Sequence, residues 1–173
     1  MIMSRSANQL LLPVRPWFIL FSLLLALLAD MVPIGREPSW PSFTALVLVF
    51  WNVHQPRRVG VGWAFVLGLL IDVHQGALLG QHALAFSLLG FLAVSLHRRL
   101  LWFGLLQQAA QVLPLFALAH GVEVLVRWLT GGMAPGWGLL WAPLTEAALW
   151  PLATWVLLAP QRRAPDRDAH RPL

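Results

Sequence analysis

The chain has 173 residues, of which 58% are hydrophobic and only 11% are charged. Soluble domains carry about 25% charged residues, so this chain has too little charge to cover a water-facing surface, and we expect lipid to be its solvent. Cysteine is absent, which excludes disulfides and thiolate metal sites. The net charge is +5, but the cations are dispersed at the ends of apolar segments, a pattern that does not predict nucleic-acid binding.

The positions of the arginines predict how the chain threads the membrane. All 12 cationic residues are arginines, and the pairs Arg57–Arg58 and Arg98–Arg99 separate long apolar stretches. Cytoplasmic loops accumulate such residues, because arginine crosses the bilayer unfavourably. Six spans with both termini in the cytoplasm leave only Arg36 and Arg127 outside. The other cytoplasmic arginines would be Arg5, Arg15, Arg162, Arg163, Arg167 and Arg171.

The first two apolar stretches, about 17–34 and about 41–55, raise separate questions. The first is too long for the apolar core of a signal peptide and lacks a small-residue cleavage site, so we interpret it as an uncleaved span. The second is shorter than the roughly 17 residues that a crossing helix needs. We nevertheless expect it to cross, because Arg57–Arg58 would otherwise lie outside.

The rest of the chain predicts four more spans and a polar tail. A tight outer turn near His74–Gly76 joins spans three and four, Arg98–Arg99 marks the return to the cytoplasm, and Pro114 is expected to kink span five. The chain is thus predicted to be an all-α polytopic membrane protein, with a single six-helix transmembrane bundle over 1–160 and a disordered cytoplasmic tail over 161–173. The four later spans are expected at about 59–75, 77–96, 100–127 and 137–159.

Small residues recur every four positions around the turn between spans three and four. They are Gly68, Asp72, Gly76 and Gly80, which would share one face of a continuous helix. Small residues let helix backbones approach closely, and this drives helix packing in lipid. Two interpretations remain open: a seam that binds a partner's helix, and a hairpin that packs on itself.

Ionisable side chains gather in the outer halves of the predicted spans. Asp72 falls about 20 Å into span three, where an ionisable group is costly and usually functional. The alternative is that Asp72 caps the following helix. We predict a polar intramembrane cluster, which forms either an outward-facing pocket or a docking surface for a partner. Its members are Asp30, His74, His82, Glu123 and Glu146, with His120 near the same outer end.

Catalytic and metal-binding patterns are weak. His74 and His82 flank the same turn as Asp72, and imidazole with carboxylate suits zinc, but two histidines eight residues apart are a poor ligand signature. No Ser-His-Asp set, phosphate-binding glycine loop or carboxylate pair at catalytic spacing is evident. We therefore predict no metal, no cofactor and no enzymatic activity, with an intramembrane enzyme as the least favoured alternative.

Several segments together resemble MreD, the rod shape-determining membrane protein family. They include Pro41 with its apolar run to Trp51, the glycine-rich start of span three, and the stretch that ends Gly68-Leu-Leu-Ile-Asp72. The polar pair His54–Gln55 departs from this pattern, which expects more apolar residues there. The resembling segments are 41–51, 56–62, 65–72, 76–80, 83–84, 107–108 and 149–151.

The resemblance implies a non-enzymatic, multi-pass scaffold in the bacterial cytoplasmic (inner) membrane. Proteins of this family work with an MreC-like protein, with MreB and with the RodA–transpeptidase pair to direct sidewall peptidoglycan synthesis. Their fold is similar to the S subunits of energy-coupling-factor (ECF) transporters, which makes a small-molecule-binding or transporter-like subunit the second hypothesis. Membrane lipid is an expected partner, nucleic acid is not, and a homo-oligomer is left open.

Overall fold

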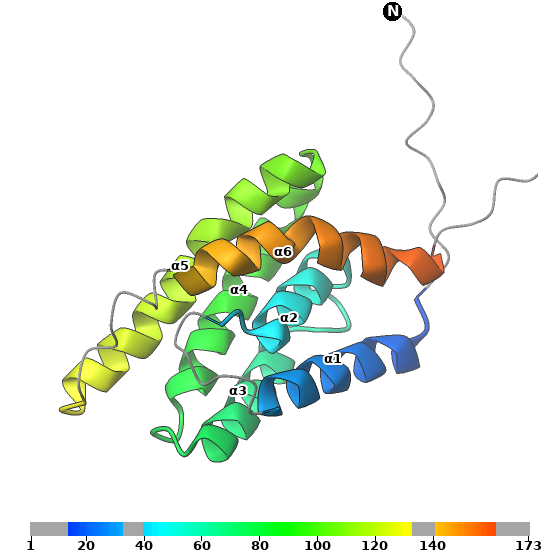
Figure 1. Ribbon diagram of the computed structural model, residues 1–173. Coiled ribbons are helices and arrows are strands. Elements are labelled where there is room, and N and C mark those ends of the chain that lie inside the picture. The colour runs from blue at the N-terminus through cyan, green and yellow to red at the C-terminus, as the bar shows by residue number, and fades with distance from the viewer. Residues whose placement is uncertain (1–13, 33–39, 133–140, 162–173) are drawn as a thin grey trace, which may run out of the picture.

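The computed structural model describes residues 14–32, 40–132 and 141–161, and every regular element in these ranges is a helix (Figure 1). The all-α prediction is confirmed for this part of the chain, which holds six α-helices and one short 3₁₀ helix. The elements are α1 (Pro16–Met31), α2 (Phe43–His54), α3 (Val61–Gln75), α4 (Gln81–Leu101), α5 (Leu105–Leu129), α6 (Trp141–Leu158) and η3 (Ala159–Gln161).

Helix length divides the bundle into two groups. Three helices are long and apolar enough to cross a membrane, namely α4, α5, and α6 continued by η3. The other three, α1, α2 and α3, are apolar but shorter. The 12 residues of α2 span only about 18 Å at 1.5 Å per residue. The hydrocarbon core of a bilayer is about 30 Å thick. The structure therefore supports a multi-helix membrane protein, while the count of six crossings stays a prediction.

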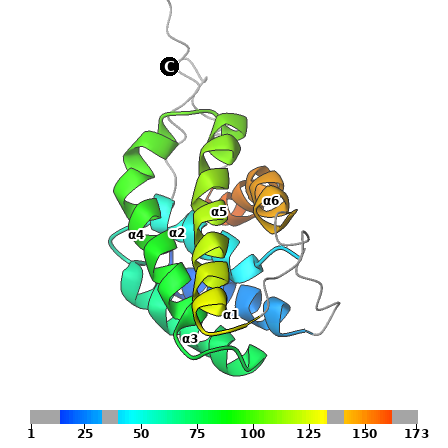
Figure 2. The same ribbon diagram turned by 90° about the vertical axis from the view of Figure 1, so that its left-hand side faces the viewer.

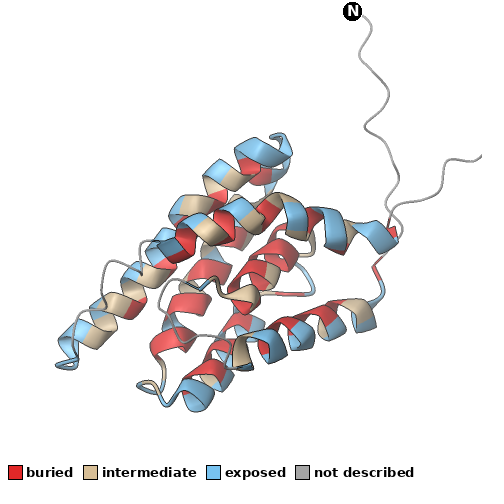
Figure 3. Cartoon of the chain, in the orientation of Figure 1, coloured by how far each residue is buried: buried red, intermediate tan, exposed pale blue. Residues whose placement is uncertain are grey.

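The short helix α2 forms the centre of the bundle. It packs against α1, α4 and α6, and nine of its residues are buried, as the red ribbon of α2 shows in Figure 3. Trp51 is fully buried and donates a hydrogen bond from its indole nitrogen to Ser22 Oγ of α1 at 2.8 Å. Enclosure by neighbouring helices, rather than length, thus gives α2 its apolar surroundings.

The helices α5 and α6 are joined by a similar buried bond. The indole nitrogen of Trp150 donates to Gln108 Oε1 at 3.2 Å, and Gln108 Nε2 donates to the carbonyl oxygen of Phe103 at 2.9 Å. In lipid, such bonds between helices supply cohesion that the hydrophobic effect does not. Large apolar side chains on the outer faces, among them Phe91 and Leu125, are exposed, as expected of lipid-facing helices.

The helices α3 and α4 form a hairpin whose backbones nearly touch. A Cβ atom added at Gly68 would lie 2.4 Å from the Cα atom of Ala83, and one added at Gly90 would lie 3.1 Å from the Cβ atom of Ala64. Gly68 therefore belongs to a seam within the chain, which is the self-packing interpretation of the glycine spacing. Figure 2 shows the same antiparallel arrangement continuing from α4 to α5.

The shared face predicted for Gly76 and Gly80 is corrected by the structure. Gly76 ends α3 with φ 61° and Gly80 precedes α4 with φ 101°, so the helix is interrupted between them. Both values are in the left-handed region that glycine adopts without strain. An added Cβ atom would meet nothing within 4 Å at either position, so these two glycines shape the connection and take no part in the seam.

Two other boundaries differ from the predicted ones. The outer turn lies at 76–80, later than predicted, and α4 continues through Arg98–Arg99 to Leu101 before the connection at 102–104. Cations in the last turn of a helix interact favourably with its negative end, so the arginine pair continues α4 instead of ending it. Pro114 lies inside α5. The loop prediction beyond Gly132, the tail beyond Gln161, and Arg5, Arg36, Arg162, Arg163, Arg167 and Arg171 fall outside the described residues.

Candidate functional site

Asp72 at the end of α3 binds the beginning of α4. Its carboxylate accepts hydrogen bonds from the backbone nitrogens of Gly80 at 2.8 Å, His82 at 2.8 Å and Ala83 at 3.3 Å. The Nδ1 atom of His82 lies 2.8 Å from Asp72 Oδ1. The first N–H groups of a helix have no partner within that helix and form its positive end. Asp72 supplies that partner from inside the bundle, where it is 0% exposed.

Asp30 does the same for the beginning of α2. It lies in the last turn of α1 and accepts hydrogen bonds from the backbone nitrogens of Phe43 at 2.8 Å and Thr44 at 2.9 Å, and from Ser42 Oγ at 3.0 Å. Ser42 Oγ in turn accepts from the backbone nitrogen of Ala45 at 3.2 Å, as an N-cap residue does. The N-terminus of α2 is therefore held by α1.

Glu146 brings α6 to the same end of α2. Its Oε1 atom accepts a hydrogen bond from the backbone nitrogen of Ser42 at 2.9 Å and lies 3.1 Å from His120 Nε2 of α5. The Nδ1 atom of His120 lies 3.3 Å from Glu123 Oε2, and this oxygen lies 3.9 Å from His82 Nε2. His120 therefore connects the Glu146 side of the cluster to the His82–Asp72 side.

These contacts form one continuous set, which we name the acid–histidine network. It links α1, α3, α4, α5 and α6 and includes the N-terminal ends of α2 and α4. The side chains of its histidines and of Glu123 are between 8% and 13% exposed, and those of Asp72 and Glu146 are 0% exposed. The network comprises Asp30, Asp72, His82, His120, Glu123 and Glu146, and Ser42 joins Asp30 to Glu146.

Two helix ends and two imidazoles offset the charge of the four carboxyl groups. Buried carboxylates are tolerated when hydrogen bonds and opposite charges surround them. The compensation is incomplete at one atom, because Glu146 Oε2 has no hydrogen-bond partner among the described residues. The arrangement is suited to fixing helix positions, since each carboxyl group contacts a helix, or the cap of a helix, other than its own.

Four of the five predicted cluster residues are brought together, and one is not. Asp30, His82, Glu123 and Glu146 belong to the network, and Asp72 joins them. The remaining member, His74, is exposed on the last turn of α3. The turn between α3 and α4 directs His82 inward toward Asp72, and this choice between two flanking histidines requires the folded hairpin.

Two further residues hold the network together and were not among the predicted cluster members. His120 was grouped with the outer ionisable side chains, but its bridging position depends on how α5 packs against α6. Ser42 had a local signal, because a serine directly before an apolar run is a typical helix N-cap. Its contacts with Asp30 and Glu146 lie 12 and 104 residues away along the chain, and no local pattern indicates them.

The network side chains line neither of two grooves in the described part of the chain. One groove lies between α1 and α3 and the other between α4 and α5, and both are lined mainly by apolar residues. No group of three or more His, Cys, Asp or Glu residues in the described ranges is arranged to hold a metal ion. The outward-facing pocket and the docking surface for a partner both stay predictions.

A helical bundle with apolar outer faces, three helices long and apolar enough to span a bilayer, and paired ionisable groups is typical of a helical membrane protein. The model of the family described as rod shape-determining protein MreD matches residues 8–158. The rod shape-determining protein MreD of Haemophilus influenzae is 30% identical over 149 residues, which cover 82% of this chain and 88% of that protein. The chain belongs to the MreD family.

The comparisons confirm the family resemblance found in the sequence and support a role in rod shape determination. No solved structure matches the chain, so the likeness to ECF transporter S subunits stays a prediction.

Proposed function

We propose that this protein is a multi-pass scaffold of the bacterial inner membrane that helps maintain rod shape by binding other membrane proteins of the elongation machinery, an MreC-like protein foremost. The family match over residues 8–158 carries the proposal. MreB and the RodA–transpeptidase pair are further partners within it. The geometry of the bundle favours a binding role and indicates which surface a partner would use.

The chemistry of the network favours a structural role over a catalytic one. The carboxyl groups of Asp72 and Asp30 are each occupied by at least three hydrogen bonds to helix ends. A general acid or base needs access to a reacting group, and hydrogen bonds to helix ends already occupy these oxygens. This supports a protein that acts by presenting surfaces.

The distribution of charge supports the predicted topology. The described arginines at one end of the bundle precede α1, lie between α2 and α3, or lie at the end of α4. The start of α1 and the end of α6 lie on the same side of the bundle in Figure 1. An even number of crossings with both termini in the cytoplasm fits this arrangement and the tendency of arginine to stay inside.

The last turn of α3 and the connection to α4 form the surface we propose for an MreC-like partner. Val73 is 71% exposed and Leu79 is 68% exposed, and His74 is exposed beside them. Asp72 binds the far side of this connection and fixes its shape through Gly80 and His82. In this proposal Asp72, Gly76 and Gly80 position the surface, and the exposed side chains contact the partner.

Two exposed leucines at opposite ends of the bundle provide a matched test. Leu79→Gln changes the proposed surface, and Leu106→Gln changes the first turn of α5, where Leu106 is 80% exposed. Each full-length variant would be expressed in a rod-shaped bacterium that lacks its own copy of this protein. Cell shape and co-purification of the MreC-like partner would be measured together.

We expect Leu79→Gln to reduce co-purification and to produce rounded cells, and Leu106→Gln to behave as the wild type. Equal membrane levels of both variants would show that the difference is one of binding. Full partner recovery with Leu79→Gln would contradict the proposed surface, and failure of the wild-type chain to restore rods would contradict the proposed function itself.

A further inference from the structure

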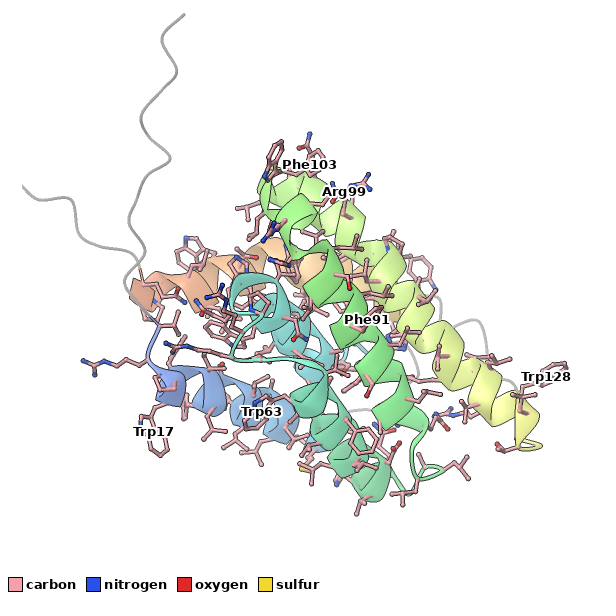
Figure 4. The ribbon with its side chains drawn as sticks, turned by 180° about the vertical axis from the view of Figure 1, so that it is seen from behind. Trp17, Trp63, Phe91, Arg99, Phe103 and Trp128 are labelled. Atoms are coloured by element: carbon pink, nitrogen blue, oxygen red, sulfur yellow. The ribbon has the colours of Figure 1, made fainter. Side chains whose placement is uncertain are left out.

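A groove between α1 and α3 combines an apolar floor with a cationic mouth. Its volume is about 370 Å³, within the range of small-ligand sites. Trp63, labelled in Figure 4, lies where α1 and α3 meet and forms one wall. The groove is lined by Pro16, Ile19, Leu20, Leu23, Arg58, Val59 and Trp63.

Arg58 is held at this groove by the chain itself. Its Nη1 atom donates a hydrogen bond to the carbonyl oxygen of Val14 at 2.7 Å. A guanidinium group has five N–H donors in a fixed fork, so this bond orients Arg58 and leaves other donors for a ligand. Arg57 and Arg15 are exposed on the same two segments and add positive charge around the mouth.

No described carboxylate balances this charge. The four acidic residues in the described ranges all belong to the acid–histidine network. Asp30, the acidic residue of α1, follows Arg15 by 15 positions in a helix, a separation of about 22 Å. Among the described residues the cations at the groove thus have no acidic partner, and the guanidinium fork favours phosphate oxygens.

We propose that the α1–α3 groove binds an anionic phospholipid. Its phosphate contacts Arg58, with Arg15 and Arg57 nearby, and one acyl chain lies along Leu20 and Leu23. This site goes beyond the scaffold function, since it requires no protein partner. Charge complementarity at the mouth and the apolar floor both match a lipid whose headgroup lies at the membrane surface.

The side chains that line the groove favour a lipid over a partner's helix. Helix–helix contacts in membranes concentrate small residues, which let the backbones approach. This groove is walled by isoleucine, leucine and tryptophan, with an arginine at its mouth. A thin, flexible acyl chain fits between such side chains, whereas a helix of about 10 Å diameter requires a wider and smoother surface.

The test uses full-length protein in lipid nanodiscs that contain a small fraction of phosphatidylglycerol carrying a photoreactive group on its acyl chain. The same group on zwitterionic phosphatidylcholine provides the lipid control. After illumination, mass spectrometry of the peptides locates the labelled residues. We expect phosphatidylglycerol to label Leu20, Leu23 or Trp63 about tenfold more than phosphatidylcholine does, since a charge-assisted bond contributes at least that factor.

Adjacent arginines provide the matched protein control. Arg58→Gln and Arg57→Gln remove the same charge one residue apart, but only Arg58 lines the groove. We expect about tenfold less groove labelling with Arg58→Gln and less than a twofold change with Arg57→Gln. Equal losses would indicate a diffuse surface potential, and unchanged labelling in both would indicate no headgroup site; either result overturns the proposal.

A second variant separates lipid binding from folding, because Arg58→Gln also removes the bond to Val14. Leu20→Trp fills the groove and leaves Arg58 in place, and we expect it to abolish the preference for phosphatidylglycerol at Trp63. Persistence of that preference would overturn the proposed acyl position. The same labelling can be repeated in native membranes that contain partner proteins. If the outer faces of α1 and α3 are labelled there and the groove is not, a protein occupies the groove and the proposal is overturned.

Discussion

The two ends of this bundle treat charged side chains in opposite ways. At the end that carries the acid–histidine network, the carboxyl groups face inward and bind the N-termini of α2 and α4. At the other end, Arg15, Arg57 and Arg58 are exposed, and Arg99 projects from the end of α4 in Figure 4. The same figure shows Trp128 at the end opposite Arg99 and Phe103.

Side-chain length and helix polarity explain the difference. A carboxylate is short and finds strong donors in the free N–H groups of a helix N-terminus, so it can be satisfied in the interior. An arginine side chain is long and can keep its charged head in water while its stem covers apolar surface. The first end therefore contributes to the cohesion of the bundle, and the second presents its charge at the surface of the bundle.

Among the variants that test this contrast, Asp72→Ala should cause the largest loss of unfolding free energy. It leaves the backbone nitrogens of Gly80, His82 and Ala83 and the ring of His82 without their partner. Removing one partner from a buried charged set costs about 3–5 kcal/mol, and we expect a loss of this size in unfolding free energy. Reversible unfolding of the purified protein in mixed detergent–SDS micelles measures it.

Asp72→Asn is the control for this change. It keeps one acceptor oxygen and nearly the same volume, so we expect it to lose less stability than Asp72→Ala. A loss below about 1 kcal/mol for Asp72→Ala would mean that the bonds of Asp72 contribute little to the bundle.

Gly68→Leu should have the next largest effect, because it breaks the α3–α4 seam beside the network. Its Cβ atom alone would lie 2.4 Å from the Cα atom of Ala83, so the two helices must separate. Overpacking of this kind costs about 1–3 kcal/mol, measured by the same unfolding experiment. Gly62→Leu is the control in the same helix, since a Cβ atom there meets nothing within 4 Å. Equal losses in the two variants would contradict the seam.

Ser42→Ala tests the N-cap of α2 and should cost about 1 kcal/mol of unfolding free energy. It removes the hydroxyl that donates to Asp30 and accepts from Ala45, while the backbone bonds of Asp30 and Glu146 remain. Ser95→Ala is its control, because the Ser95 hydroxyl donates to the carbonyl oxygen of Phe91 on the exposed side of α4. If both variants lose the same stability, Ser42 does not act as a cap.

Arg98→Gln should have the smallest effect on stability. Arg98 lies in the last turn of α4, and surface substitutions of this kind usually change stability by less than about 0.5 kcal/mol. Unfolding in micelles should therefore leave it close to the wild type, in contrast to Asp72→Ala. A loss above about 1 kcal/mol would show that the arginine end also contributes to the cohesion of the bundle and would remove the contrast between the two ends.

Much of the helical framework could be predicted from local properties of the chain. Apolar runs bounded by arginine, proline and glycine indicated six helices, because burial in lipid and helix breaking both depend on residue type along a short stretch. The observed helix boundary differs from the predicted one where arginines that indicate a cytoplasmic loop also stabilise the end of a helix. Arg98–Arg99 was assigned to a loop because of its charge, but charge also stabilises the last turn of α4.

The site was predictable only in its general location. The depth of Asp72 and the alternative that it caps the next helix both followed from its position before a turn. The choice of His82 over His74 did not, because it depends on the left-handed conformation of Gly76 and Gly80. The bridging position of His120 required the packing of α5 against α6, and so did the bond from Ser42 to Glu146.

By itself, the sequence determined that this is an apolar helical protein of the MreD family. Composition and the residue pattern of each segment do not depend on how the segments pack together. Only the tertiary structure decided that the interior acidic residues and two histidines join into one network and that Arg58 stands at the mouth of an apolar groove. Hydrogen bonds and grooves depend on distances between residues remote in the chain, and those distances exist only after the helices have packed.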